Sequence, residues 1–67
     1  MTTPTTIAER IIAAREAKGL TGAELAEQAG LTPAQVSLYQ HGIEPRLANL
    51  RKIAEVLGTT VADLMAE

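Results

Sequence analysis

The stretch "AEQAGLTPAQV", residues 26–36, decides the fold, because it predicts the end of one helix, a tight turn and the start of another. Gly30 can adopt the left-handed backbone conformation with which many helices end. Thr32 is a typical N-cap, and Gln35, three residues later, completes a capping box. Pro33 suits the first helical position, where its missing N–H costs nothing. The segment therefore predicts two helices separated by only a few residues.

Ala26, Gly30 and Val36 lie before, in and after this turn, at a spacing that is typical of two packed helices. They lie four and six residues apart. A small residue allows two helices to touch, a glycine can reverse the chain, and a β-branched residue can pack into the core from the second helix. The two helices are therefore expected to pack tightly against each other.

Hydrophobic periodicity on both sides of this pair predicts further helices. One covers about Thr6 to Lys18 and stops at Gly19. Another follows the turn "GIEP", residues 42–45, and is bounded by Gly58. Its apolar residues recur at helical spacing at Leu47, Leu50, Ile53, Ala54 and Leu57.

Capping patterns place the remaining helix ends. Thr21 with Glu24 predicts the start of the helix that Gly30 closes, and the helix after the turn is expected over about Pro33 to His41. Thr60 with Asp63 predicts a short last helix that carries Val61 and Leu64. Five helices without a strand pattern indicate an all-α fold.

The composition excludes several kinds of site. The chain has 67 residues, no cysteine and one histidine, so it offers neither disulfides nor a cluster of metal ligands. It shows no nucleophile paired with a base and no glycine-rich loop that could hold a phosphate. We therefore expect no enzymatic activity, no metal and no cofactor, and no small-molecule ligand is evident.

Neither a membrane span nor a signal peptide is expected. No apolar run approaches the roughly 18 residues that a span requires, and Met1 to Thr6 lacks a basic region followed by an apolar one. This pattern favours a cytoplasmic protein without membrane contact. We expect a flexible N-terminal lead over residues 1–6 and a single domain over residues 7–66.

Motifs in register along nearly the whole chain, Ile7 to Met65, carry a family resemblance. They are "ERI" at residues 9–11, "KGLT" at 18–21, "ELAEQAGL" at 24–31, "VS" at 36–37, "GIEP" at 42–45, "NLRKIAEVLG" at 49–58 and "ADLM" at 62–65, with Arg15 between the first two. In these motifs the chain resembles the phage-repressor and Cro-like helix-turn-helix family, also called the xenobiotic-response-element (XRE) family. The resemblance implies a five-helix, lambda-repressor-like DNA-binding domain whose second and third helices form the helix-turn-helix.

The resemblance also implies a function and partners. Members of this family usually act as transcriptional regulators that bind double-stranded operator DNA as homodimers. The third helix lies in the major groove, while the start of the second helix and the loop before the fourth contact phosphates. In this chain, Val61, Leu64 and Met65 are candidate dimer contacts, although Val61 and Leu64 are also suited to docking the last helix on its own core.

Four positions depart from the family pattern. Gly22 stands where a glutamine usually contacts phosphate, and Leu38 stands where arginine or lysine is usual. Gln40 replaces a glutamate and is expected to face Arg10, which weakens a structural ion pair. Arg46 replaces the usual serine or threonine N-cap, at a cost of about 1 kcal/mol of helix stability, but it places a cation near a phosphate site.

The outward face of the third helix follows from a rotation of about 100° per residue. If Val36 faces the core, Ala34 and Leu38 point outward. Ser37 and Gln35 flank them. Apolar side chains can contact thymine methyl groups, and glutamine can pair with adenine. No arginine is available for guanine, so we expect a weakly selective or A·T-leaning reader that relies on DNA shape and phosphate contacts.

The residues predicted to contact DNA combine this face with the phosphate-contacting ends of the helices. They are Thr21, Thr32, Ala34, Gln35, Ser37, Leu38 and Arg46.

Structural interpretations compete with several of these contacts. Gln35 can serve only as the capping partner of Thr32, and Ser37 can be a filler at a close helix contact. Leu38 can belong to a protein-facing patch with Ile12 and Ile43. Tyr39 is expected to pack, with a hydroxyl that reaches solvent, rather than to form a stacking platform.

The formal net charge of −2 runs against nucleic-acid binding, because DNA affinity usually draws on a basic surface. The alternative function is therefore a helix-turn-helix scaffold with weakened DNA binding, used for protein–protein contact.

Overall fold

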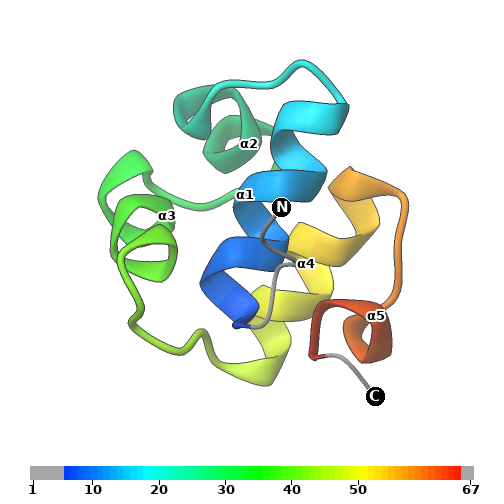
Figure 1. The fold of residues 1–67 in the computed structure, drawn as a ribbon. Coiled ribbons are helices and arrows are strands. Elements are labelled where there is room, and N and C mark those ends of the chain that lie inside the picture. The colour runs from blue at the N-terminus through cyan, green and yellow to red at the C-terminus, as the bar shows by residue number, and fades with distance from the viewer. Residues whose placement is uncertain (1–5, 66–67) are drawn as a thin grey trace.

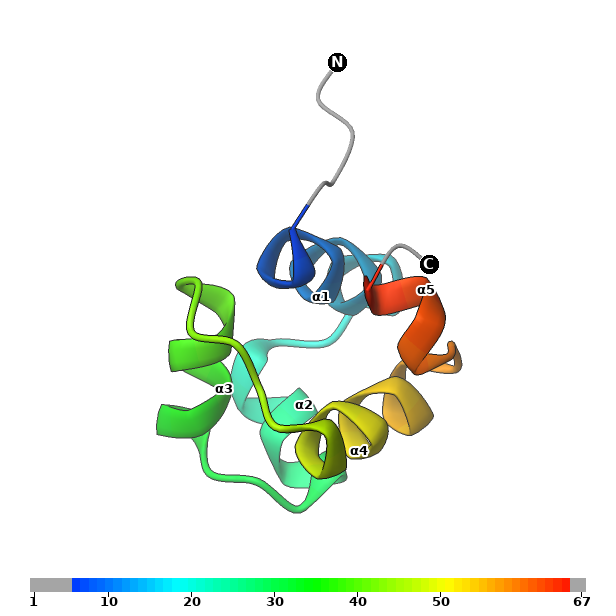
Figure 2. The same cartoon turned by 90° about the horizontal axis from the view of Figure 1, so that it is seen from below.

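Five α-helices follow one another along residues 6–65, which are the residues that the computed structural model describes. Between these limits no residue is in a strand. In both Figure 1 and Figure 2, α3 and α5 lie at opposite sides of the molecule. The helices are α1 (Ile7–Ala17), α2 (Gly22–Ala29), α3 (Pro33–Gln40), α4 (Leu47–Leu57) and α5 (Val61–Met65). The predicted all-α, five-helix class is confirmed.

Two of the predicted helices are slightly too long, because their expected end residues are caps. Thr6 is the N-cap of α1, where its Oγ1 accepts a hydrogen bond from the Glu9 N–H at 3.1 Å, and Lys18 is the C-cap. His41 is the C-cap of α3. Thr6 was expected to belong to the flexible lead and instead caps a helix. The rest of that lead, residues 1–5, and residue 66 of the expected domain lie outside the described residues.

The turn between α2 and α3 forms as predicted. Gly30 has φ 72° and ψ 28°, the left-handed conformation, and the Leu31 N–H donates to the Ala26 carbonyl at 2.8 Å. Thr32 then caps α3 in a complete capping box with Gln35. Because a left-handed residue is strained for most side chains, the glycine allows this abrupt change of direction.

The core lies where α2 and α3 pack against α1 and α4, and α5 covers one end of it by packing on α1 and α4. It contains Ile11, Leu25, Ala26, Ala29, Val36, Tyr39, Leu50, Ile53, Ala54, Leu57 and Leu64. Leu47 departs from its predicted place on the apolar face of its helix: as the first residue of α4 it extends beyond the core and is 52% exposed.

Tyr39 ties α3 to α4. Its ring is buried, and its hydroxyl accepts a hydrogen bond from Asn49 Nδ2 at 2.8 Å. A buried tyrosine needs such a partner for its polar end. The predicted packing role is confirmed, with the hydroxyl bonded to α4 rather than free in solvent.

None of the helices within residues 6–65 has the length and apolar character needed to cross a lipid bilayer.

Arg46 leaves the start of α4 without a side-chain cap, since no cap hydrogen bond forms there. We expect Arg46→Ser to raise the free energy of unfolding by about 1 kcal/mol, because a serine hydroxyl can accept a hydrogen bond from the first turn. Urea denaturation measures this change. Arg51→Ser, at an exposed position in the middle of α4, is the control and is expected to bring no gain. An equal or lower stability for Arg46→Ser would refute the capping argument.

Two capping carboxylates predict how stability depends on pH. Hydrogen bonds from the Thr21 backbone and side chain lower the pKa of Glu24, and the Thr59 hydroxyl, followed by Thr60, lowers the pKa of Asp63. A carboxylate with a lowered folded-state pKa stabilises the protein above its unfolded-state pKa, and this contribution is lost as the pH falls through the folded-state pKa.

Stability should therefore decline on acidification below about pH 4, the ordinary carboxyl range. Glu24→Gln should flatten part of that decline, because an amide does not titrate. Thermal unfolding monitored by circular dichroism, in buffers from neutral to acidic pH, checks both statements. A melting temperature that rises on acidification would contradict them.

Candidate nucleic-acid interface

The outward face of α3 is exposed and carries no charged side chain from Pro33 to Gln40. Ala34, Ser37 and Leu38 are exposed, with Leu38 at 53%, while Val36 between them is fully buried. The rotation of the helix is therefore the one predicted. Figure 2 shows α3 at the edge of the molecule.

Gln35 serves as the capping partner of Thr32. Its Oε1 accepts the Thr32 N–H at 2.9 Å, and its own N–H donates to Thr32 Oγ1 at 3.1 Å. The predicted capping box of Gln35 is thus confirmed. The capping box uses Oε1 and not the Nε2 amino group, so a donor to a neighbouring base stays available at this side chain.

Thr21 performs the same task at the start of α2. Its Oγ1 accepts the Glu24 N–H at 3.1 Å, and Glu24 Oε1 accepts the Thr21 N–H at 2.9 Å. The ionised form of Glu24 is favoured by these bonds, so its lowered pKa keeps a negative charge in the first turn of the helix. This charge lies beside a position that was predicted to contact phosphate, and it opposes a close approach of DNA.

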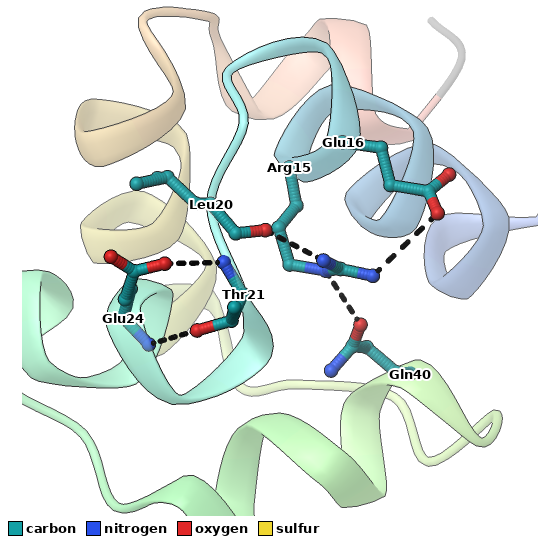
Figure 3. A network of polar contacts seen from close by, with 6 residues as sticks. All are labelled: Arg15, Glu16, Leu20, Thr21, Glu24 and Gln40. Atoms are coloured by element: carbon teal, nitrogen blue, oxygen red, sulfur yellow. Dashed lines mark hydrogen bonds and ion pairs between the residues drawn. The ribbon is translucent and has the colours of Figure 1, made fainter.

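The guanidinium of Arg15 joins three segments, as Figure 3 shows. Its Nε donates to Gln40 Oε1 at 3.0 Å, and its Nη1 donates to the Leu20 carbonyl at 2.6 Å. Nη2 lies 4.0 Å from a carboxylate oxygen of the exposed Glu16. Arg15 therefore links α1 to the loop before α2 and to the last residue of α3.

The prediction that Gln40 faces Arg10 is wrong. Residues 10 and 15 are five positions apart, which turns them by about 140° relative to each other around a helix. Arg10 instead points toward α5, where its Nη1 lies 3.5 Å from the Asp63 carbonyl. Its Nε is buried and has no hydrogen-bond partner among residues 6–65.

Exposed apolar side chains continue from α3 into the next loop. The Ile43 N–H donates to the Leu38 carbonyl at 3.0 Å, and Ile43 is 55% exposed. Leu47, which follows at the start of α4, is similarly exposed. Ile12 was expected in this patch but is only partly exposed. The sequence-based interpretation missed Leu47, because it counted that residue with the core.

The cations that follow α3 in the chain lie at the start of α4 and along it. Arg46 is exposed at the start of α4, immediately after the loop that leaves α3. Arg51 and Lys52 are exposed farther along the same helix. Within residues 6–65, no group of three or more histidine, aspartate or glutamate side chains is arranged to hold a metal ion. The outward face of α3 is thus neutral, and the next cation along the chain is Arg46 at the start of α4.

Comparison with known proteins places this geometry in a family. A helix-turn-helix family model matches residues 11–64. Comparison with curated protein sequences finds no match. Among solved structures, a crystal structure of SinR, the master regulator for biofilm formation, in complex with DNA is 32% identical, with a TM-score of 0.85. The alignment covers 90% of this chain and 98% of that one.

Two further solved structures are similar to this chain. SinR in its complex with the SinI protein is 33% identical, with a TM-score of 0.86, over 92% of this chain and 62% of that one. HppE with bound iron(II) is 37% identical, with a TM-score of 0.80, over 94% of this chain. This chain spans 34% of that HppE chain, so the likeness concerns one part of HppE and does not imply catalysis. The chain belongs to the XRE-type helix-turn-helix family of DNA-binding regulators.

Proposed function

We propose that this protein is a transcriptional regulator that docks α3 in the major groove of operator DNA, as a homodimer. The observation that carries the proposal is the free outward face of α3, which is exposed over Ala34, Ser37 and Leu38 while the opposite face is buried. SinR, whose fold this chain shares over nearly its whole length, has been crystallised with DNA. An α-helix fits the major groove, where each base pair presents a distinct pattern.

The chemistry of this face favours A·T base pairs. The side chains of Ala34 and Leu38 can contact thymine methyl groups, and Ser37 can donate to or accept from several base edges. Gln35 keeps its Nε2 donor, although its Oε1 is used for capping. Because no arginine or lysine lies on α3, a bidentate contact to guanine is not available from this helix.

Positioning on the backbone is proposed to come from the helix ends. Arg46 supplies a cation next to the α3–α4 loop, while Thr21 and Thr32 lie at the first turns of α2 and α3. Backbone N–H groups at such ends favour phosphate. The few cations and the charge of Glu24 make weak binding with a shallow salt dependence the expected behaviour, because the slope grows with the number of phosphates that cations neutralise.

Fewer of the candidate dimer residues are exposed than the sequence indicates. Of the three candidate residues at the C-terminal end, Leu64 is buried and Val61 is partly buried against the core of the same chain. Among the three, Met65 is the exposed residue, at 38%, and is the one we propose for contact with a second copy.

A protein partner is the alternative target for the same face. The exposed side chains of Leu38, Ile43 and Leu47 are apolar, and the protein is acidic overall. SinR is also known in a complex with another protein, SinI. Under this alternative, the apolar surface binds protein and DNA binding is weakened.

Salt dependence separates the two functions. For the regulator, we expect binding to A·T-rich duplexes whose affinity falls as salt rises, because phosphate contacts release counterions. Arg46→Ser should reduce the slope of log affinity against log salt by about 1, the loss of one phosphate contact. Fluorescence anisotropy titrations at several salt concentrations measure both slopes. An absence of binding at low salt would rule out the regulator.

A charge placed on α3 tests which surface meets the DNA. We expect Leu38→Glu to reduce DNA affinity by about tenfold or more, since a carboxylate would face the phosphates and the groove. Ala13→Glu is the matched control: it adds the same charge at an exposed residue of α1, beside Arg10 and Asp63 and outside both α3 and the candidate dimer contacts. Equal losses for the two variants would show that α3 is not the contact surface.

A further inference from the structure

The first residue of α2 and the last residue of α3 meet, although they are 18 positions apart in the chain. A Cβ atom added to Gly22 would lie 3.0 Å from Gln40 Nε2. Carbon and nitrogen atoms without a hydrogen bond between them ordinarily keep about 3.5 Å or more. The amide of Gln40 therefore occupies the space that a side chain at position 22 would need.

Arg15 prevents the Gln40 amide from moving aside freely. An arginine can only donate hydrogen bonds, so Nε of Arg15 must face the carbonyl oxygen of the amide. That bond is 3.0 Å long, and the guanidinium is itself fixed by its bond to the Leu20 carbonyl. With Oε1 directed to Arg15, Nε2 is directed to Gly22. The arrangement in Figure 3 thus determines which end of the amide meets α2.

We propose that Gly22 and Gln40 together set the position of α3 in the DNA complex, and that the effect of a change at one of them depends on the residue at the other. This inference rests on the proposed function, in which α3 enters the major groove. Gln40 acts as a positioning residue: it holds the end of α3 against the start of α2, and it can do so because Gly22 has no side chain. A side chain at position 22 fits only if residue 40 is changed as well.

This coupling changes the expected effect of a glutamine at position 22 on DNA binding. Related proteins usually have a glutamine at position 22 that contacts phosphate, so adding one here is expected to strengthen DNA binding. In this chain the new Cβ would press on the Gln40 amide and strain its hydrogen bond to Arg15, which holds the end of α3. Gly22→Gln alone should therefore weaken DNA binding.

A double-mutant cycle tests this coupling with four proteins: the wild type, Gly22→Gln, Gln40→Ala and the variant with both changes. Affinity for an A·T-rich duplex is measured at low salt, at a temperature where circular dichroism shows every variant folded. Melting temperatures are recorded for the same proteins without DNA. Gln28→Ala, the same truncation at an exposed residue of α2, controls for the loss of a glutamine.

We expect Gly22→Gln alone to lower the melting temperature and to reduce affinity by about fivefold, as mild overpacking would. In the Gln40→Ala background the same change should raise the melting temperature, since glycine is a poor helix former, and should no longer reduce affinity. Gln40→Glu, which keeps an acceptor for Arg15, should retain affinity close to that of the wild type.

Effects of Gly22→Gln that are the same in both backgrounds would overturn the coupling, and a gain in affinity from Gly22→Gln alone would do so as well. If none of the proteins binds DNA, the regulator proposal fails and, with it, the role of the pair in DNA binding. The melting temperatures still decide whether the two positions are coupled in the fold, so the two failures are distinguishable.

Discussion

The close contact between α2 and α3 is the constraint on which the rest of the molecule depends. Ala26 and Val36 are both fully buried where these helices meet, and Gly30 reverses the chain between them in the left-handed conformation. A larger residue at position 26 would separate the helices, because protein interiors have little free volume. This contact fixes the rotation of α3. It thereby decides that Val36 faces the core and Leu38 faces outward.

A second set of contacts holds the other end of α3. Arg15 reaches from α1 to Gln40, and Gln40 in turn lies against Gly22. A hydrogen bond requires a particular distance and angle, so these polar contacts restrict how the helices are oriented around a core that is otherwise apolar. The resulting domain presents a rigid but uncharged helix. Under the proposed function, we expect its specificity for DNA to depend on shape and methyl contacts more than on charge.

Local patterns in the sequence were sufficient to predict most of the fold. The capping boxes at Thr21 and Thr32 involve residues only three positions apart, so their hydrogen bonds could be inferred from the sequence alone. The partner of Gln40 could not, because the pair joins residues 25 positions apart and depends on which faces of α1 and α3 meet. The exposure of Leu47 was missed for a related reason: helical periodicity identifies a face, but not where the core ends along it.

The contact surface can be observed residue by residue in a nuclear magnetic resonance titration of the isotopically labelled protein with an A·T-rich duplex. If α3 reads the groove, the largest shifts of backbone amide signals lie at Thr32, in residues 34–38 and at Thr21 and Gly22, and they exceed the shifts of the α5 amides. Shifts centred on α5, or an unperturbed α3 in the presence of bound DNA, would contradict the assignment of this helix as the recognition element.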